Sequence, residues 1–185
     1  MKIDITTALV DEHRLIKRML TLLEKNGSET AAGRYLNWQF YLDGVDFIRN
    51  FADRFHHAKE EDVLFNALVD NGMPRQNSPV AAMLMEHDLG RDYVRAMEEA
   101  AAKAAGGDTA ARQTVTDNAL AYAELLRNHI SKEDEILYPL AERIIPDSMR
   151  PGITQGYAEA ENRVDQDFCH KYQALIEHYE TESPE

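Results

Sequence analysis

The chain of 185 residues carries a formal net charge of −13, with 44% hydrophobic and 29% charged residues. This balance is typical of a soluble globular domain, and the acidic excess argues against binding to nucleic acid or to anionic membranes. A single cysteine, Cys169, excludes an intramolecular disulfide and a cysteine-based metal cluster within the chain. No apolar run approaches the ~20 residues that span a bilayer, and no signal peptide is recognisable. We therefore expect a cytoplasmic protein without a nucleic-acid or membrane partner.

Nearly the whole chain is predicted to be helical, because proline and glycine gather at a few places and no stretch alternates apolar and polar residues. The first helix is expected over residues 4–25, with Asp4 or Thr6 as its cap, and a turn over residues 26–33 follows it. His13 lies in the apolar stripe of this helix. The stripe also contains Leu9, Val10, Ile16 and Leu20.

The second helix, expected over residues 34–70, contains His56 and His57, each followed four residues later by a glutamate, Glu60 or Glu61. Residues four apart share a face of a helix, so each pair can present an imidazole and a carboxylate to one point. The face that contains His56 is largely apolar, whereas the face that contains His57 is polar in its first half. This pattern places His56 and Glu60 in the core, with His57 and Glu61 beside them. Helical faces are ~100° wide, so the rotated register, with His57 and Glu61 as ligands, stays open.

The third helix is expected after a break at residues 71–78, with Pro79 in its first turn, where a missing N–H is harmless. His87 again lies within an apolar stripe. Two glycines and an aspartate at residues 106–108 predict the end of this helix.

The fourth helix, expected over residues 109–145, repeats the pattern of the second. His129 precedes Glu133 by four residues, and aligning the Lys-Glu steps of the two helices pairs His129 with His56 rather than His57. The predicted apolar stripe also contains Val115, Leu125, Leu126, Ile136 and Leu137.

A fifth helix is expected over residues 157–179, and residues 183–185 are expected to fray. Four long helices with short connections predict an all-α fold: an antiparallel up-down-up-down four-helix bundle with an additional C-terminal helix. We assign residues 1–150 to the bundle and residues 151–185 to a helical extension packed on or beside it.

Each bundle helix thus supplies one histidine from its apolar face, and two of the helices also supply a glutamate. The six residues are His13, His56, Glu60, His87, His129 and Glu133. A lone buried histidine is more often hydrogen-bonded than metal-bound, but burying six such groups without partners would cost ~1–3 kcal/mol each. A metal centre removes this cost, and imidazole with carboxylate suits iron, manganese or zinc. Two carboxylates can bridge two metals, with two histidines left for each. His170 and His178 lie on the terminal helix, outside the repeated pattern, and are expected on the surface.

The order His…His-x-x-x-Glu…His…His-x-x-x-Glu, with the flanking words EHRLIKRML, HHAKEEDVLF, MEHDLGRDY and HISKEDEILYP, resembles the hemerythrin-like, HHE cation-binding family over about residues 11–146. The resemblance implies a non-haem di-iron centre, bridged by Glu60 and Glu133 and capped by four histidines. The sequence departs from the oxygen-carrying hemerythrins at two places. Arg91 stands where those proteins have a further histidine, and Glu133 follows His129 at four residues rather than five. A symmetric four-histidine site is expected to handle dioxygen differently.

Three functions compete. The leading hypothesis is a protein with two iron ions, or manganese or zinc, that binds, senses or reacts with dioxygen, peroxide or nitric oxide, or that senses or holds iron. The second is a di-iron oxidase or peroxide-consuming enzyme, in which Tyr93, Tyr122 or Tyr138 supplies electrons or protons; core packing is the plainer interpretation of these tyrosines. The third is a metal-free helical interaction module. The sequence predicts no particular protein partner.

Overall fold

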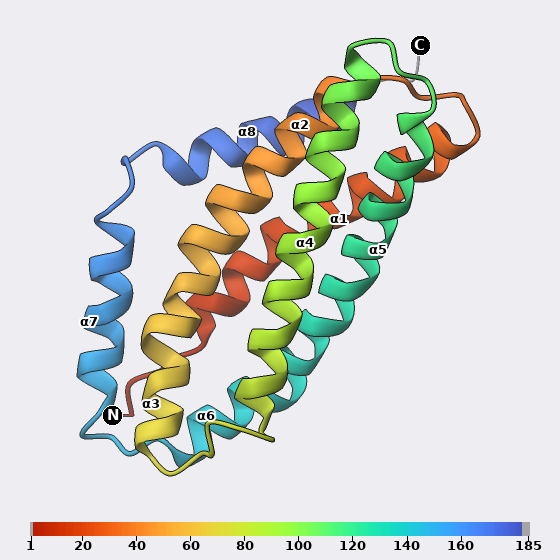
Figure 1. Ribbon diagram of the computed structural model, residues 1–185. Coiled ribbons are helices and arrows are strands. Elements are labelled where there is room, and N and C mark those ends of the chain that lie inside the picture. Colours follow the sequence, from red (N-terminus) through yellow and green to blue (C-terminus); the bar gives the residue numbers. More distant parts are fainter. Residues whose placement is uncertain (1, 183–185) are drawn as a thin grey trace.

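The computed structural model describes residues 2–182, and within this range all regular structure is helical, without a strand. Long helical segments lie side by side in a bundle, with two shorter helices at its side (Figure 1). The elements are α1 (Thr7–Ala31), α2 (Trp38–Phe47), the π-helical segments η1 (Ile48–His57) and η2 (Glu60–Leu64), α3 (Phe65–Asp70), α4 (Pro79–Ala105), α5 (Ala111–Lys132), the π-helical segment η3 (Glu133–Leu137), α6 (Tyr138–Ile144), α7 (Arg150–Glu161) and α8 (Phe168–Thr181).

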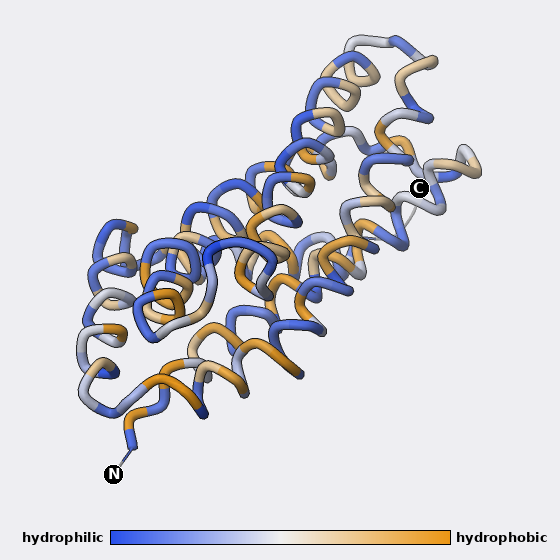
Figure 2. The backbone as a smooth tube through the Cα atoms, turned by 60° about the horizontal axis from the view of Figure 1, so that its bottom comes forward, coloured by the Kyte–Doolittle hydropathy of each residue, from blue (hydrophilic) through white to orange (hydrophobic). Residues whose placement is uncertain are grey.

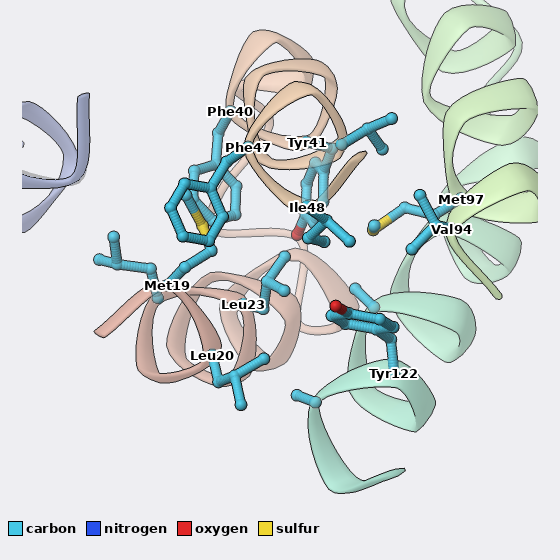
Figure 3. Close-up of a cluster of buried hydrophobic side chains, with 14 of the residues drawn as sticks. Met19, Leu20, Leu23, Phe40, Tyr41, Phe47, Ile48, Val94, Met97 and Tyr122 are labelled. Carbon is cyan, nitrogen blue, oxygen red and sulfur yellow. The ribbon is translucent and has the colours of Figure 1, made fainter. Parts of the chain in front are cut away.

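Two hydrophobic clusters fill the bundle. Hydrophobic and hydrophilic residues interchange around the turns of the long helices, as amphipathic helices require (Figure 2). The larger cluster joins α1, α2, η1, α4, α5 and α8, and part of it is shown in Figure 3. The smaller cluster surrounds Leu9, Leu64 and Leu137. In every long helix the predicted site residues lie between the two clusters. In α1, for example, His13 lies between Leu9 of the smaller cluster and Ile16 of the larger one.

The first helix is longer than predicted, and the expected turn at residues 26–33 is wrong. The helix continues to Ala31, and Asn26 and Gly27 are buried within it. A Cβ atom at Gly27 would lie 3.1 Å from Leu120 Cδ2, so glycine permits a close helix–helix contact here rather than a turn. At the other end, Asp4 acts as predicted: its Oδ1 accepts a hydrogen bond from the Thr7 backbone at 2.7 Å.

The second and fourth long helices each pass through π-helical turns beside the predicted site. A π turn closes i→i+5 hydrogen bonds and therefore shifts the phase of the residues that follow. Beside these turns, His56 and His57 are both buried, at 1% and 6% exposure. In the fourth helix the shift turns Ile136 outward, to 59% exposure, so its predicted place in the apolar stripe is wrong.

The C-terminal segment forms two helices, α7 and α8, where a single helix over residues 157–179 was expected. Residues 162–167, which separate them, are polar apart from Val164, and one apolar side chain does not continue the apolar stripe of the first helix. The buried Arg150 fixes the start of α7, because its guanidinium donates to the Ile3 carbonyl at 2.7 Å and to Glu142 Oε2 at 2.6 Å. The predicted fraying of residues 183–185 lies outside the described residues. Among residues 2–182, no helix combines the length and hydropathy needed to cross a membrane.

Candidate metal centre

The six predicted residues meet in one buried layer between the two hydrophobic clusters. None of their exposed fractions is above 2%. The members are His13 from α1, His56 from η1, Glu60 from η2, His87 from α4, His129 from α5 and Glu133 from η3. The structure thus brings all six predicted residues together in one buried layer.

The four histidines form two pairs whose Nε2 atoms face each other. The Nε2 atoms of His13 and His56 lie 2.9 Å apart, and those of His87 and His129 lie 3.0 Å apart. Each pair joins two helices that are distant in the sequence, so helix packing alone sets the spacing.

The opposite nitrogen of each imidazole, Nδ1, faces a carboxylate. In the first pair, His13 Nδ1 lies 2.7 Å from Asp134 Oδ1, and His56 Nδ1 lies 2.8 Å from Glu12 Oε2. A carboxylate can only accept a hydrogen bond, so these contacts place a proton on each Nδ1.

The second pair repeats this arrangement. His87 Nδ1 lies 2.7 Å from Glu61 Oε1, and His129 Nδ1 lies 2.9 Å from Glu86 Oε2. With Nδ1 protonated, a neutral imidazole presents a lone pair at Nε2. Two such lone pairs 3 Å apart repel each other unless a proton or a metal ion lies between or beside them.

Each buried carboxylate lies between the two histidine pairs. Glu133 places Oε2 3.4 Å from His13 Nε2 and Oε1 3.0 Å from His129 Nε2. Glu60 Oε2 lies 3.8 Å from His56 Nε2 and 3.6 Å from His87 Nε2. Both side chains therefore reach toward both pairs, as bridging ligands would.

Three oxygens of these carboxylates have no hydrogen-bond partner within residues 2–182: Glu60 Oε2 and both oxygens of Glu133. Burial and the neighbouring Glu133 carboxylate raise the pKa of Glu60 well above its ordinary value. Burial acts in the same direction on Glu133, but the His129 and His13 imidazoles lower its pKa overall. Buried oxygens without partners are costly, and a cation in the layer would satisfy them. The donor set therefore fits a metal ion.

A cation holds each of the four carboxylates that face Nδ1 from its outer side. The pairs are Lys59 with Glu12, Lys132 with Glu86, Lys17 with Asp134 at 2.7 Å, and Arg91 with Glu61 at 2.7 Å. Lys17 and Arg91 stand four residues after the histidines of their helices, so the two halves of the site match each other. Arg91, which occupies the position of the missing fifth histidine, thus fixes Glu61 against His87.

Two positions break this symmetry. The Tyr138 hydroxyl donates to Glu60 Oε1 at 2.7 Å, and its ring stacks on His13 with 5.6 Å between centroids. The matching ring on the other side is Phe65, which stacks on His87 at 6.0 Å and has no hydroxyl.

His57 is the second asymmetric residue. Its ring stacks on His87 with 3.8 Å between centroids, and its Nδ1 lies 3.5 Å from Asp53 Oδ1, too far for a strong hydrogen bond. One ligand atom each of His57, Glu60, His87 and His129 lie within 4.8 Å of one another. The alternative ligand of the sequence analysis is therefore adjacent to one histidine pair, whereas Glu61 hydrogen-bonds to an imidazole from outside.

A second group of ligand atoms within the same limit comprises His13, His56 and Glu133. His170 and His178 are exposed, as predicted. Tyr93 is only partly buried, at the edge of the larger cluster. The exposed Cys169 takes no part in either group.

Glu12, Glu86 and Asp134 were not predicted from the sequence as parts of the site. A signal was present: an acidic residue directly precedes His13 and His87, and another directly follows Glu60 and Glu133. Local periodicity assigns such neighbours to a different helical face. Their role depends on the facing helix.

A buried layer of histidines and carboxylates inside a helical bundle defines a class of metal-binding helical proteins. The family model of the hemerythrin HHE cation binding domain matches residues 4–141, and the chain belongs to this family.

Relatives among curated proteins are distant. Uncharacterised proteins of Mycobacterium bovis and of two strains of Mycobacterium tuberculosis are 22% identical over 155 residues, or 84% of this chain. The chain spans 60% of the length of these relatives. No solved structure matches.

Proposed function

We propose that this chain is a dinuclear metal protein that uses iron, with manganese or zinc as possible substitutes. His13 and His56 would hold one ion, and His87 and His129 the other. Glu60 and Glu133 would bridge the two ions, because each carboxylate reaches toward both histidine pairs. One observation carries the proposal. Within each histidine pair the two Nε2 atoms face each other, and the Nδ1 atom of each ring already contacts a carboxylate.

The proposed function is to bind, sense or react with dioxygen, peroxide or nitric oxide, or to sense or hold iron. Iron, when bound, supplies redox chemistry and an affinity for such small ligands. The chain contributes the remaining properties. Its helices exclude bulk water, and the Tyr138 hydroxyl holds one oxygen of Glu60. The carboxylates at Nδ1 orient the imidazoles and make each Nε2 a stronger electron-pair donor to a metal ion.

An oxidase or peroxide-consuming enzyme is the second candidate, and Tyr138 supports it. Its hydroxyl lies 2.7 Å from Glu60 Oε1 and 3.5 Å from His13 Nε2, close enough to deliver a proton to the site. A metal-free interaction module is disfavoured, because it would leave the buried oxygens of Glu60 and Glu133 without compensation.

The proposal includes an antiparallel up-down-up-down order of the four long helical segments, which their short connections support. It also retains the cytoplasm as the location, on the basis of the single cysteine.

The test is anaerobic iron loading of the untagged protein, followed by metal analysis and by titration with dioxygen, nitric oxide and peroxide. We expect about two irons per chain and an optical change with at least one ligand. The exposed His178→Ala variant serves as a control and should bind the same amount. A stable ratio near one or zero would contradict the dinuclear proposal. Sustained turnover of peroxide would favour the enzyme.

A further inference from the structure

A pocket of about 200 Å³ lies between η1, α4 and α5, beside one of the two histidine pairs. His57 and His87 line it, so it borders the buried layer. No residue of α7 or α8 lines it. An enclosed apolar cavity of ~150 Å³ is large enough to hold benzene, so this pocket has room for a molecule of one ring.

The body of the pocket is apolar. Ile48, Val94 and Leu126 contribute aliphatic walls, and Gly90 leaves space because it has no side chain. Figure 3 shows that Ile48, Val94 and Tyr122, from three different helices, converge at this part of the larger cluster.

The charged residues around the pocket are already paired with one another or with neighbours. Arg49 binds Glu98 through two hydrogen bonds of 2.5 and 2.6 Å, and Arg95 binds Asp92 at 2.7 Å. Arg91 donates to Asp53 at 2.7 Å. A charged guest would have to compete with these pairs, so the lining favours an uncharged guest.

Two buried polar atoms of the lining have no hydrogen-bond partner within the described residues: the Tyr122 hydroxyl and His57 Nδ1. Tyr122 is only 2% exposed, so bulk water does not compensate its hydroxyl. A buried hydroxyl without a partner is unusual, and a guest with an acceptor oxygen would supply that partner.

We propose that this pocket binds a small, uncharged, single-ring organic molecule that carries one oxygen, of the class of simple phenols. The ring would lie among Ile48, Val94 and Leu126, and the oxygen would accept a hydrogen bond from Tyr122. The guest would lie beside His87, so its role in any reaction rests on the proposed metal function, whereas its binding does not.

The test is a titration of the full chain with phenol, in metal-free and iron-loaded form, followed by calorimetry or NMR. We expect saturable binding with a dissociation constant on the order of 1 mM or below. Toluene, which lacks the oxygen, should bind more weakly, and so should benzoate, which is charged. Non-saturable phenol binding, or tighter binding of benzoate than of phenol, would overturn the inference.

Variants locate the site. Tyr122→Phe should weaken phenol binding roughly three- to tenfold and leave toluene unchanged. Gly90→Leu should abolish the binding of both, because a Cβ at this position meets the Tyr122 ring at 3.4 Å and the rest of the side chain fills the pocket. The matched control is Ala102→Leu, at an exposed position of the same helix. If circular dichroism shows that Gly90→Leu does not fold, Val94→Phe fills the pocket from another position of α4.

Unchanged phenol binding in a folded, filled variant would place the phenol elsewhere and contradict the inference. Metal content is measured on every sample, because the two proposals can fail separately. Iron binding without phenol binding would refute only the proposal for the pocket. Phenol binding without iron binding would refute only the proposed metal function.

Discussion

Each imidazole of the buried layer uses its two nitrogens differently. Nδ1 donates to a carboxylate, and Nε2 faces a second imidazole, as in the contacts of His13 with Asp134 and His56. A carboxylate behind a ligating imidazole fixes the ring and its tautomer, and losing such a partner typically reduces metal affinity 10- to 100-fold. At this scale the outer carboxylates therefore belong to the proposed site as much as the histidines do.

Removal of either bridging carboxylate should affect both ions. We expect Glu60→Ala and Glu133→Ala to lose most of the bound metal by similar amounts, because each side chain reaches toward both histidine pairs. A single histidine variant such as His13→Ala should retain a mononuclear remnant. Metal analysis of the three variants decides this. If one Glu variant kept two tightly bound irons, that residue would not be a bridge.

The two adjacent histidines should differ in their effect on metal binding. His56→Ala should lose the ion that it would share with His13, since the Nε2 atoms of the two rings lie 2.9 Å apart. His57→Ala should retain most of the metal, since its ring stacks face-on against His87 instead. Both proteins are purified identically and assayed for iron. Loss of metal confined to His57→Ala would show that the sequence-based register is rotated by one residue.

Metal affinity should rise with pH. Burial lowers the pKa of His13, but the neighbouring Asp134 and Glu133 carboxylates raise the pKa overall. Burial also lowers the pKa of His129, and the Glu133 carboxylate raises it overall. The raised pKa stabilises the metal-free fold below about pH 6.5, the ordinary value for histidine, and this gain is lost as pH rises through the folded-state value. Metal must displace these protons.

We therefore expect the apparent metal affinity to increase roughly tenfold per pH unit for each proton released, until both histidines are neutral. Competition against a chelator of known affinity, from about pH 6 to about pH 8.5, measures it. An affinity that is flat or falls with pH would contradict this assignment of protons.

Among the elements, the π-helical turns and α7 shape the surroundings of the site. The π turns run through two consecutive histidines, His56 and His57, and both lie in the interior. The helix α7 packs on η2, and its Glu161 reaches the buried Lys59 at 3.0 Å. Lys59 in turn binds Glu12, the carboxylate behind His56. The C-terminal extension is thus connected to one histidine pair.

Docking of α7 should depend on a glycine. A Cβ at Gly156 would lie 3.0 Å from both methyl groups of Val63, so Gly156→Val should lower the free energy of unfolding by about 1–3 kcal/mol. In the control variant Gly152→Ala, the added Cβ meets nothing within 4 Å, and stability should be unchanged or slightly increased. Denaturant titrations compare the two. Equal stabilities would show that α7 does not pack tightly on η2.

For the molecule as a whole, a polar layer divides the core into two hydrophobic clusters. The two sides of this layer differ. The helices α7 and α8 lie against one side of the bundle (Figure 1), whereas the pocket between η1, α4 and α5 borders the His87 side. Access to the layer is therefore expected from the pocket.

Metal should stabilise the whole fold, because only the folded chain assembles the site. At free metal concentrations about 1,000 times the dissociation constant, the gain is ~4 kcal/mol, or a rise in Tm on the order of 10 °C for a chain of this size. Thermal melts with and without iron measure it, and a chelator should reverse it. Glu133→Ala should lose most of the gain. A wild-type Tm that does not respond to metal would argue against a structural centre.

The sequence by itself determined the helical fold and the inward-facing residues. Apolar residues that recur with a period of 3.6 indicate helices and their apolar faces from local information. Asp4 before α1 and Pro79 at the first turn of α4 mark where two of these helices begin. The same period selected His56 and Glu60 for the core, and both are buried.

Tertiary structure alone decided the pairing of the histidines, the four carboxylates behind them, the stacking of His57 on His87 and the pocket at Tyr122. Each of these features joins different helices, so it depends on how the helices are rotated and shifted against each other. Local periodicity does not contain that information. The helical course through Gly27 has the same origin, since close packing of this glycine against Leu120 outweighed local turn propensity.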